Sequence, residues 1–409
     1  QVPICEEKLN QSELLESLKG EEWLKEIRKS ALTTAGELKF PTGQQEKWKY
    51  SPIHKLSLDA YKPVTLPPSQ TSNPEHTNYI ELLDGHLISE ASSDNYEVKQ
   101  LNQQLEPFNF ATPSDFFSQL NTALSPDPVI IEIPRLAQIK KPIVIINSTS
   151  TDSGMSFPKL CITVGDGAHV QIVEIFESNE VKALSVPETR IEIGNDANVK
   201  YQQIQANQRQ IWQLGRLDIS VGKQSDFNGA TVGLGGAYSR METTCRLTGR
   251  GASATLSAIY LGDEDQILDY RTYQEHIGKN TQSNLLFKGV LDDKASSIYT
   301  GLIQVHKEAS GTNAYQTNRT IKLSEDTWAE SVPNLEIENN DVRCSHASTV
   351  SPVDDDQRFY LESRGIPTES VDQLIVQGFL NEVVQKLPIE SVNNTILQML
   401  LAKQQSGAL

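Results

Sequence analysis

Cysteine is scarce in this sequence, and the few that occur are widely separated. The 409 residues include only Cys5, Cys161, Cys245 and Cys344. No two of them form a C-x-x-C pair, which excludes a zinc ribbon and a thioredoxin-like motif. Scattered single thiols in a chain of this length are typical of a reducing compartment. We therefore expect a cytoplasmic protein, or one of the plastid stroma if a transit peptide has been removed.

Long apolar runs and excess positive charge are also lacking. No stretch approaches the roughly 18 apolar residues of a membrane span, and residues 1–7 lack the apolar core of a secretory signal. Lys and Arg number 36 against 53 Asp and Glu, which gives a net charge of -17. Because such a chain repels phosphate backbones, we expect neither nucleic acid nor a membrane among its partners.

The common catalytic motifs are missing as well. Gly222 and Gly278 each precede a lysine but lack the upstream glycine of a P-loop, so ATP hydrolysis of that kind is excluded. Residues 233–236 are Gly-rich, but Tyr238 stands where G-x-G-x-x-G needs its third glycine, which disfavours dinucleotide binding. No G-x-S-x-G and no H-E-x-x-H occurs. The chain has the length of an enzyme without an enzyme's motifs, and we expect no catalytic activity.

The N-terminal part of the chain has mixed periodicity. Apolar residues recur at helical spacing over residues 14–27 and again over 114–124, so we expect a mainly helical region over residues 1–125. Residues 63–74 are rich in Pro and Ser, which is typical of a loop. Residues 79–89 alternate between polar and apolar as in a strand.

The middle part, residues 126–350, consists of short runs rich in Val, Ile, Thr and Tyr. Similar turns begin at Gly165, Gly194, Gly222 and Gly249, 27–29 residues apart. A period of this length marks stacked repeats, and the near absence of helical segments disfavours βαβ units. The sequence therefore predicts a mainly-β solenoid, with a large β-sandwich as the alternative.

Two later turns, at residues 292–295 and 325–329, are expected to continue this series less regularly. The ends of a solenoid are open and need caps or partners, because each repeat buries its faces only against its neighbours. We therefore expect additional segments or a partner protein at the ends of this core.

The C-terminal part, residues 351–409, returns to helical periodicity. A first helix is expected to end at Gly365, a C-cap followed by Pro367. Thr368 can begin a second helix that ends at Pro388, and residues 392–403 form a third. The second helix carries one predicted apolar stripe, which consists of Val371, Leu374, Ile375, Phe379, Val383 and Leu387.

Cys344 and His346 form the most specific local feature. In an extended strand the two side chains point to the same side, because side chains alternate with a period of two. A thiolate and an imidazole can both ligate iron. Two ligands do not complete a tetrahedral site, so further ligands would have to come from elsewhere, for example a second subunit. Taken alone, the pair also fits a buried thiol beside an ordinary histidine.

Three stretches of sequence resemble one family. Residues 335–346 read L-E-I-E-N-N-D-V-R-C-S-H, residues 359–366 read F-Y-L-E-S-R-G-I, and residues 41–50 read P-T-G-Q-Q-E-K-W-K-Y. They are similar to signatures of the SufB/SufD family of iron–sulfur cluster assembly proteins. The resemblance covers most of the chain and also includes His276, Thr281, Ser283, Lys288, Gly289, Gly301 and Asn318.

Within this family the chain resembles the SufD type. SufB-like members carry an acidic–His–acidic triplet where this chain has Cys344, Ser345 and His346. They also carry a core cysteine near the position of Trp328. By this resemblance the chain offers only part of a cluster's ligand set by itself.

The resemblance implies a right-handed parallel β-helix core with a helical N-terminal region and a helical C-terminal domain. It implies a non-enzymatic scaffold subunit of the SufBCD complex, whose core pairs with SufB. Cys344 and His346 would act as metal ligands in cluster assembly at that interface, with iron or a cluster held transiently and no tightly bound cofactor. The C-terminal domain would bind the ATPase SufC through a region that includes Phe379, Leu380, Glu382 and Val383.

Two other functions stay open at this point. The chain could be a SufB-like scaffold that works as a homodimer, and the isolated chain could also pair with itself. A carbohydrate-active β-helix enzyme would need paired carboxylates on a groove. Asp263, Glu264 and Asp265 offer acidity, although such a run is typical of a solvated turn.

Overall fold

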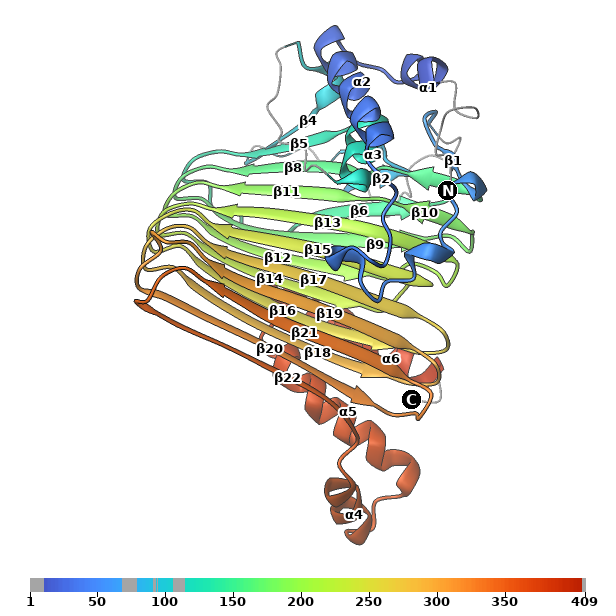
Figure 1. Ribbon diagram of the computed structural model, residues 1–409, viewed down its shortest axis with the longest axis vertical. Helices are drawn as coiled ribbons and strands as arrows, with labels where there is room; N and C mark the ends of the chain where they lie inside the picture. Colours follow the sequence, from blue (N-terminus) through green and yellow to red (C-terminus); the bar gives the residue numbers. More distant parts are fainter. Residues whose placement is uncertain (1–10, 68–78, 91–92, 94, 106–114, 407–409) are drawn as a thin grey trace.

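A computed structural model describes residues 11–67, 79–90, 93, 95–105 and 115–406. The chain winds through about eight coils between residues 129 and 352. Each coil adds one strand to each of two largely parallel sheets, so the coils stack along the long axis (Figure 1). The prediction of a mainly-β solenoid is therefore confirmed, and the sandwich alternative is wrong.

Sheet A forms one wall of the solenoid. Its main path runs β4 (Glu97–Gln100), β5 (Val129–Ile133), β8 (Lys159–Val164), β11 (Glu188–Ile193), β13 (Ile211–Val221), β15 (Tyr238–Leu247), β17 (Ile267–His276), β19 (Ser296–Val305) and β21 (Trp328–Ile337). The short strands off this path are β1 (Lys62–Pro63), β7 (Gly154–Ser156) and β10 (Ala183–Ser185).

Sheet B forms the other wall. It runs β3 (His86–Ser89), β2 (Ile80–Leu83), β6 (Ile143–Thr149), β9 (His169–Ser178), β12 (Asn198–Gln205), β14 (Asp226–Gly233), β16 (Ser253–Gly262), β18 (Gln282–Leu291), β20 (Thr312–Lys322) and β22 (Val342–Pro352). The strand expected over residues 79–89 is two strands, because Asp84 and Gly85 adopt positive φ and reverse the chain between β2 and β3.

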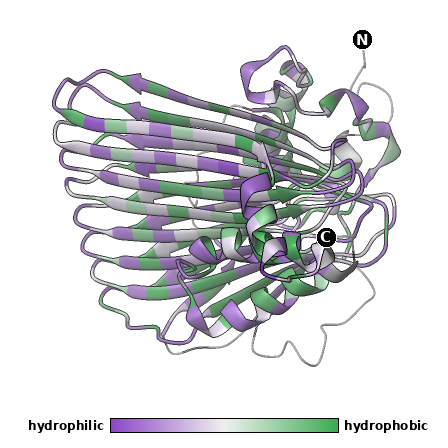
Figure 2. Ribbon diagram, turned by 90° about the horizontal axis from the view of Figure 1, so that it is seen from below, coloured by the Kyte–Doolittle hydropathy of each residue, from purple (hydrophilic) through white to green (hydrophobic). Residues whose placement is uncertain are grey.

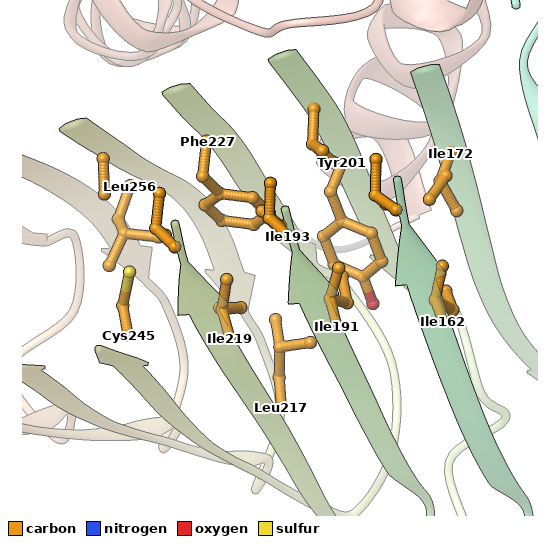
Figure 3. Packing of buried hydrophobic residues seen from close by; sticks show 14 of the residues in the cluster. Ile162, Ile172, Ile191, Ile193, Tyr201, Leu217, Ile219, Phe227, Cys245 and Leu256 are labelled. Atoms are coloured by element: carbon orange, nitrogen blue, oxygen red, sulfur yellow. The ribbon is translucent and has the colours of Figure 1, made fainter. Parts of the chain in front are cut away.

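Equivalent residues of successive coils lie in register and form rows along the interior. Ile162, Ile191 and Ile219 are register partners in sheet A. Tyr201 of sheet B is the register partner of Ile172. Figure 3 shows these side chains directed into the space between the sheets. Alternate residues of each strand therefore fill one continuous core, as the period of two requires.

The stacked turns explain the repeated glycines. A Cβ on Gly222 would lie 2.4 Å from the carbonyl oxygen of Gly194, and one on Gly249 would lie 2.1 Å from the backbone nitrogen of Lys223. Any larger residue would force the coils apart. The turns expected to continue this series, at residues 292–295 and 325–329, instead lead from sheet B to sheet A at the opposite edge. The series continues through Gly278, which lies on Gly249.

The N-terminal region covers one end of the solenoid and crosses sheet A. Antiparallel β3 and β4, four residues each, are the outermost strands at this end, so the sheets extend into the region expected to be mainly helical. Part of the loop expected over residues 63–74 lies outside the described residues. The helices here are α1 (Gln11–Ser17), α2 (Glu22–Glu37), α3 (Phe116–Leu124), and the 3-10 turns Glu46–Trp48, Ile53–Lys55, Leu58–Ala60 and Leu101–Gln103.

The tryptophan of the N-terminal signature fastens this segment to sheet A. The guanidinium of Arg240 stacks on the ring of Trp48 at 4.1 Å and donates to the carbonyl oxygen of Lys47. Ser51 donates to the buried carboxylate of Asp269, which also accepts from Arg240. The signature residues therefore serve a tertiary contact across roughly 200 residues of sequence.

The second and third C-terminal helices lie over sheet B (Figure 2), and the first projects beyond the last strands (Figure 1). Gly365 has a φ of 85° and ends the first helix as predicted. In the second helix Val371 and Val383 are buried as expected, but Leu374 is 44% exposed and Val376 and Leu380 are buried instead. The helix ends at Val384 and not at Pro388, so Leu387, which is also buried, lies after it. The helices are α4 (Asp355–Ser363), α5 (Thr368–Val384) and α6 (Glu390–Ser406).

Candidate functional site

Cys344 and His346 lie on β22, the last strand of sheet B. Cys344 is the register partner of Ala314, and His346 is the register partner of Gln316. Ala314 and Gln316 are both fully buried in the preceding coil. The two predicted site residues therefore share one side of their strand, and that side continues the interior rows of the solenoid.

The facing strand β21 supplies the opposite wall of this last coil. The hydroxyls of Ser348 and Ser331 lie 2.6 Å apart, which fixes how β22 and β21 face each other. Counting by twos from this contact, Pro333 faces His346 and Leu335 faces Cys344. Neither Pro333 nor Leu335 offers a polar side chain, so β21 supplies no ligand directly opposite Cys344 or His346.

Cys344 and His346 differ in exposure. Cys344 is half-buried and packs against the apolar cluster that contains Ile303, Val305 and Ala314. This burial raises the pKa of the Cys344 thiol, and a backbone hydrogen bond with Ala314 opposes the shift. His346 is exposed. A metal ion at Cys344 would therefore have to displace the thiol proton.

The open edges of the solenoid surround this pair. In the described part of the chain, β21 pairs only with β19 and β22 pairs only with β20, so each has one free edge. Large apolar side chains are exposed nearby on Trp328, Ile337 and Val350. Such an edge can accept strands of another protein.

The number of ligands in this site is limited. Among the residues that the structure describes, no group of three or more His, Cys, Asp or Glu side chains is arranged to hold a metal ion. The metal-ligand role of Cys344 and His346 therefore stays a prediction.

The residues predicted to contact an ATPase lie on α5 and have different environments. Leu380 and Val383 are buried in the cluster that joins the C-terminal helices to sheet B. Glu382 forms an ion pair with Lys288 at 2.6 Å, and the Lys288 ammonium lies 4.3 Å from the centre of the Phe379 ring. These side chains hold α5 on the solenoid by packing and by the ion pair. Leu380 and Val383 are therefore covered and could affect a partner only through the position of α5. The predicted contact region stays a prediction.

An exposed aromatic surface on α4 was not singled out from the sequence as a contact. Phe359 is 72% exposed and Tyr360 is 56% exposed. A hollow beside Tyr360 is also lined by Asp356, Gln357 and Leu361. The F-Y-L stretch was the available signal, because the polar and charged residues around it in the helix leave few apolar neighbours to cover the two rings.

Other residues of the sequence resemblance belong to the interior. Both ring nitrogens of His276 lie 2.8 Å from hydroxyls, those of Thr281 and Ser283. A Cβ on Gly289 would lie 1.9 Å from the Tyr260 ring. These residues therefore shape the core and do not line the open end.

The remaining cysteines lie away from this end or outside the described residues. Cys161 and Cys245 are buried, and burial raises the pKa of their thiols to about 11 and about 12. Cys245 belongs to the main core cluster between the sheets. Cys5 lies outside the described residues.

The acidic run offered for carbohydrate chemistry has a structural role at its first residue. Asp263 is buried, 2.6 Å from Arg209 and 2.7 Å from Lys403 of α6. The expectation of a solvated turn is therefore wrong for Asp263. A carboxylate held by two cations is poorly suited to general acid chemistry, because the cations keep its pKa below its ordinary value.

One protein-family model matches this chain and identifies its family. The model "SUF system FeS cluster assembly, SufBD core domain" matches residues 145–379, which is more than half of the chain. The chain belongs to the SufBD family. This match covers most of the solenoid and reaches into α5.

SufBD relatives align along nearly the whole chain. The iron–sulfur cluster assembly protein SufD of Escherichia coli is 25% identical over 383 residues, which cover 90% of each chain. SufD of Bacillus subtilis is 26% identical over 411 residues, with 93% and 94% covered. A SufBD family protein of Mycobacterium leprae is 37% identical over 185 residues, 43% of this chain and 47% of its own length. The predicted resemblance to the SufD type is confirmed.

None of the described helices is both long and apolar enough to span a bilayer. The compartment in which the chain works stays a prediction.

Proposed function

We propose that this SufBD chain is the SufD-type accessory subunit of a SufBCD iron–sulfur cluster assembly complex, a scaffold without catalytic activity of its own. The observation that carries the proposal is the position of Cys344 and His346. They lie in the last coil, where both sheets end in a free edge. Ligands at an open end are suited to a cluster that is built between two subunits.

The partner at this end would be SufB. A second β-solenoid that meets β21 and β22 with its own open end can extend sheets A and B, because antiparallel pairing of the edge strands satisfies the free backbone groups of both edges. Exposed Ile337 and Val350 would be covered in the same step. The partner would supply the ligands that Cys344 and His346 lack, and iron or the cluster is the cargo of this site.

The partner of the C-terminal helices would be the ATPase SufC. Exposed Phe359 and Tyr360 on α4 give it an aromatic surface, and aromatic side chains are common anchors of protein interfaces. Leu380 and Val383 would hold α5 on sheet B while α4 contacts SufC. Movement of the ATPase could then reach the scaffold through α5.

The first experiment is size-exclusion chromatography with light scattering after mixing the chain with SufB and SufC. We expect a stable complex of the three proteins and an ATPase rate above that of SufC alone. If the chain elutes by itself or only as a homodimer, and the ATPase rate is unchanged, the proposal is wrong.

Matched variants test the two surfaces separately. Val350→Glu places a charge at the open end, and Leu136→Glu places one in the first coil, where Leu136 is also exposed. Only Val350→Glu should weaken binding to SufB. Phe359→Ser with Tyr360→Ser should abolish the stimulation of SufC and leave SufB bound. Equal effects of Val350→Glu and Leu136→Glu would exclude the open end as the SufB surface.

A further inference from the structure

One interior row of sheet B contains a polar residue next to the candidate site. Successive register partners along this row are hydrophobic or small up to Leu285, and Gln316 follows in the next coil. Gln316 is 1% exposed. The next position in the row is His346. The row runs through Ile143, Ile172, Tyr201, Gly229, Leu256, Leu285, Gln316 and His346.

The carboxamide of Gln316 has no hydrogen-bond partner among the described residues. Both its Oε1 and its Nε2 are buried and unpaired. Leaving a buried polar group unpaired costs about 1–3 kcal/mol. Leucine would continue the row without this cost, so the carboxamide requires an explanation other than packing.

The opposite wall is shaped to admit this carboxamide. Gly301 of β19 faces Gln316, and a Cβ there would lie 2.2 Å from Gln316 Nε2. Any other residue at position 301 would push the carboxamide away from its place. The core therefore has space for a polar group in the coil that precedes His346.

Two polar neighbours lie within reach of the Gln316 carboxamide. The Tyr299 hydroxyl lies with it beside Gly301 but already bonds the Thr272 hydroxyl, which leaves His346 of the next coil. Adjacent strands of a sheet lie about 4.8 Å apart, so register partners on the same side touch. Ala314, the register partner of Cys344, has no polar side chain, and Pro333 faces His346 without one. A ligating histidine needs an acceptor for its second ring N–H, which fixes the tautomer and the ring orientation.

We propose that Gln316 is a positioning residue for His346. In the structure the two side chains are not hydrogen-bonded, but a rotation of the carboxamide would let Gln316 Oε1 accept from one ring N–H of His346. The other ring nitrogen would then present its lone pair toward the open end. The inference rests on the proposed role of the Cys344 and His346 site. It adds a residue of the preceding coil, which a ligand set of two does not include.

The test uses the full chain with Gln316→Leu and, as a matched control, Gln203→Leu. Gln203 is another buried interior glutamine, and its Oε1 is also unpaired, but it lies in sheet B four coils away. Two-bond ¹H–¹⁵N correlation spectra at pH 8 report the tautomer of His346, assigned by comparison with His346→Ala. Co²⁺ binding, followed by its thiolate absorption band, reports the affinity of the pair.

We expect one dominant His346 tautomer in the native chain, in Gln203→Leu and in Gln316→Glu, which retains an acceptor. Gln316→Leu should give a mixture of tautomers and bind Co²⁺ about 10-fold more weakly. Its urea midpoint should not fall, because leucine continues the apolar row. This stability measurement separates a positioning effect from loss of the fold.

Two results would overturn the inference. One is a Gln316→Leu chain with the native tautomer and native Co²⁺ affinity, and the other is an equal change in Gln203→Leu. The proposed function fails separately, through the absence of a complex with SufB and SufC. A tautomer change in Gln316→Leu together with absence of that complex would retain the positioning role and reject the proposed function.

Discussion

The ammonium group of Lys288 lies 2.6 Å from the carboxylate of Glu382, which joins the outer face of β18 to α5. The same ammonium donates to the carbonyl oxygen of Phe379 at 2.8 Å. Lys288 is buried, whereas the Glu382 side chain is half-exposed. The hydrogen bond from Lys288 lowers the pKa of Glu382. One lysine therefore holds the middle of a helix against the solenoid.

Lys288→Met should loosen α5. The substitution keeps an apolar stem of similar length but removes the ion pair and the hydrogen bond, which contribute about 1–3 kcal/mol when one partner is buried. Amide hydrogen exchange over residues 376–384 should rise by roughly 10-fold. Glu382→Gln should change exchange much less, because its amide oxygen can still accept from Lys288. Equal exchange in the native chain and Lys288→Met would show that packing alone holds α5.

Gly249→Ala should destabilise the stacked turns. The added methyl group would lie 2.1 Å from the backbone nitrogen of Lys223, and the backbone of the previous coil would have to shift. Overpacking of this kind costs about 1–3 kcal/mol, measurable by urea denaturation. Gly36→Ala is the control, because no atom lies within 4 Å of its added Cβ near the end of α2. It should stabilise by up to about 1 kcal/mol. Similar changes at both sites would contradict the stacking explanation.

His276 should make the stability of the chain depend on pH. Burial lowers the pKa of His276 to about 4, from an ordinary value of 6.5. Between these values the unfolded chain binds more protons than the folded chain, so stability rises with pH in this window. The full effect is on the order of 3 kcal/mol, lost as the pH falls from about 6.5 toward 4.

His276→Gln tests this pH dependence, because glutamine does not titrate. Its free energy of unfolding should change less between pH 7.5 and pH 5 than that of the native chain. His54→Gln serves as the control, because His54 is exposed. A native pH slope in His276→Gln would mean that another group is responsible.

Cys344→Ala and His346→Ala should each reduce cluster formation severalfold in the complex with SufB and SufC. Each removes one proposed ligand from an end where two are available. The complex should still assemble, since its surfaces depend on the strand edges and on α4. Cys245→Val removes a cysteine buried in the middle of the core and should leave the cluster yield unchanged. Normal yields from both site variants would remove Cys344 and His346 from the mechanism.

The solenoid could be predicted because its physical cause is local and repeated. The glycines at Gly194, Gly222 and Gly249 recur because each turn lies directly on the one before it. The two turns at residues 292–295 and 325–329 were placed at the wrong edge, because both edges connect strands of similar composition. Their side of the solenoid becomes visible only when the strands are assigned to sheets.

The stripe of α5 was partly wrong because that helix is apolar on several sides. Leu374 and Val376 lie two residues apart, and a stripe can be drawn through either. Contact with sheet B selects Val376. Contacts between distant residues could not be predicted at all, as in the pairing of Asp263 with Lys403 of α6.

The candidate pair itself was found from the sequence, but its surroundings were not. Cys344 and His346 are two residues apart, so their shared side follows from strand geometry alone. Gln316 precedes His346 by 30 residues, and only the register of β20 and β22 places them together. The period of 27–29 residues points to residues 317–319 as neighbours of His346, and the longer last coil shifts the register partner to Gln316.

The difference between the two ends of the solenoid limits how many chains can associate end to end. Short antiparallel β3 and β4 terminate the sheets at one end, and β21 and β22 leave them free at the other. A solenoid that can pair through its edge strands at one end only can bind one other such solenoid. The resulting pair then has only the two other ends, with their short antiparallel strands, exposed. Association limited to that end would stop at two members and would not build a fibre, the usual hazard of stacked parallel strands.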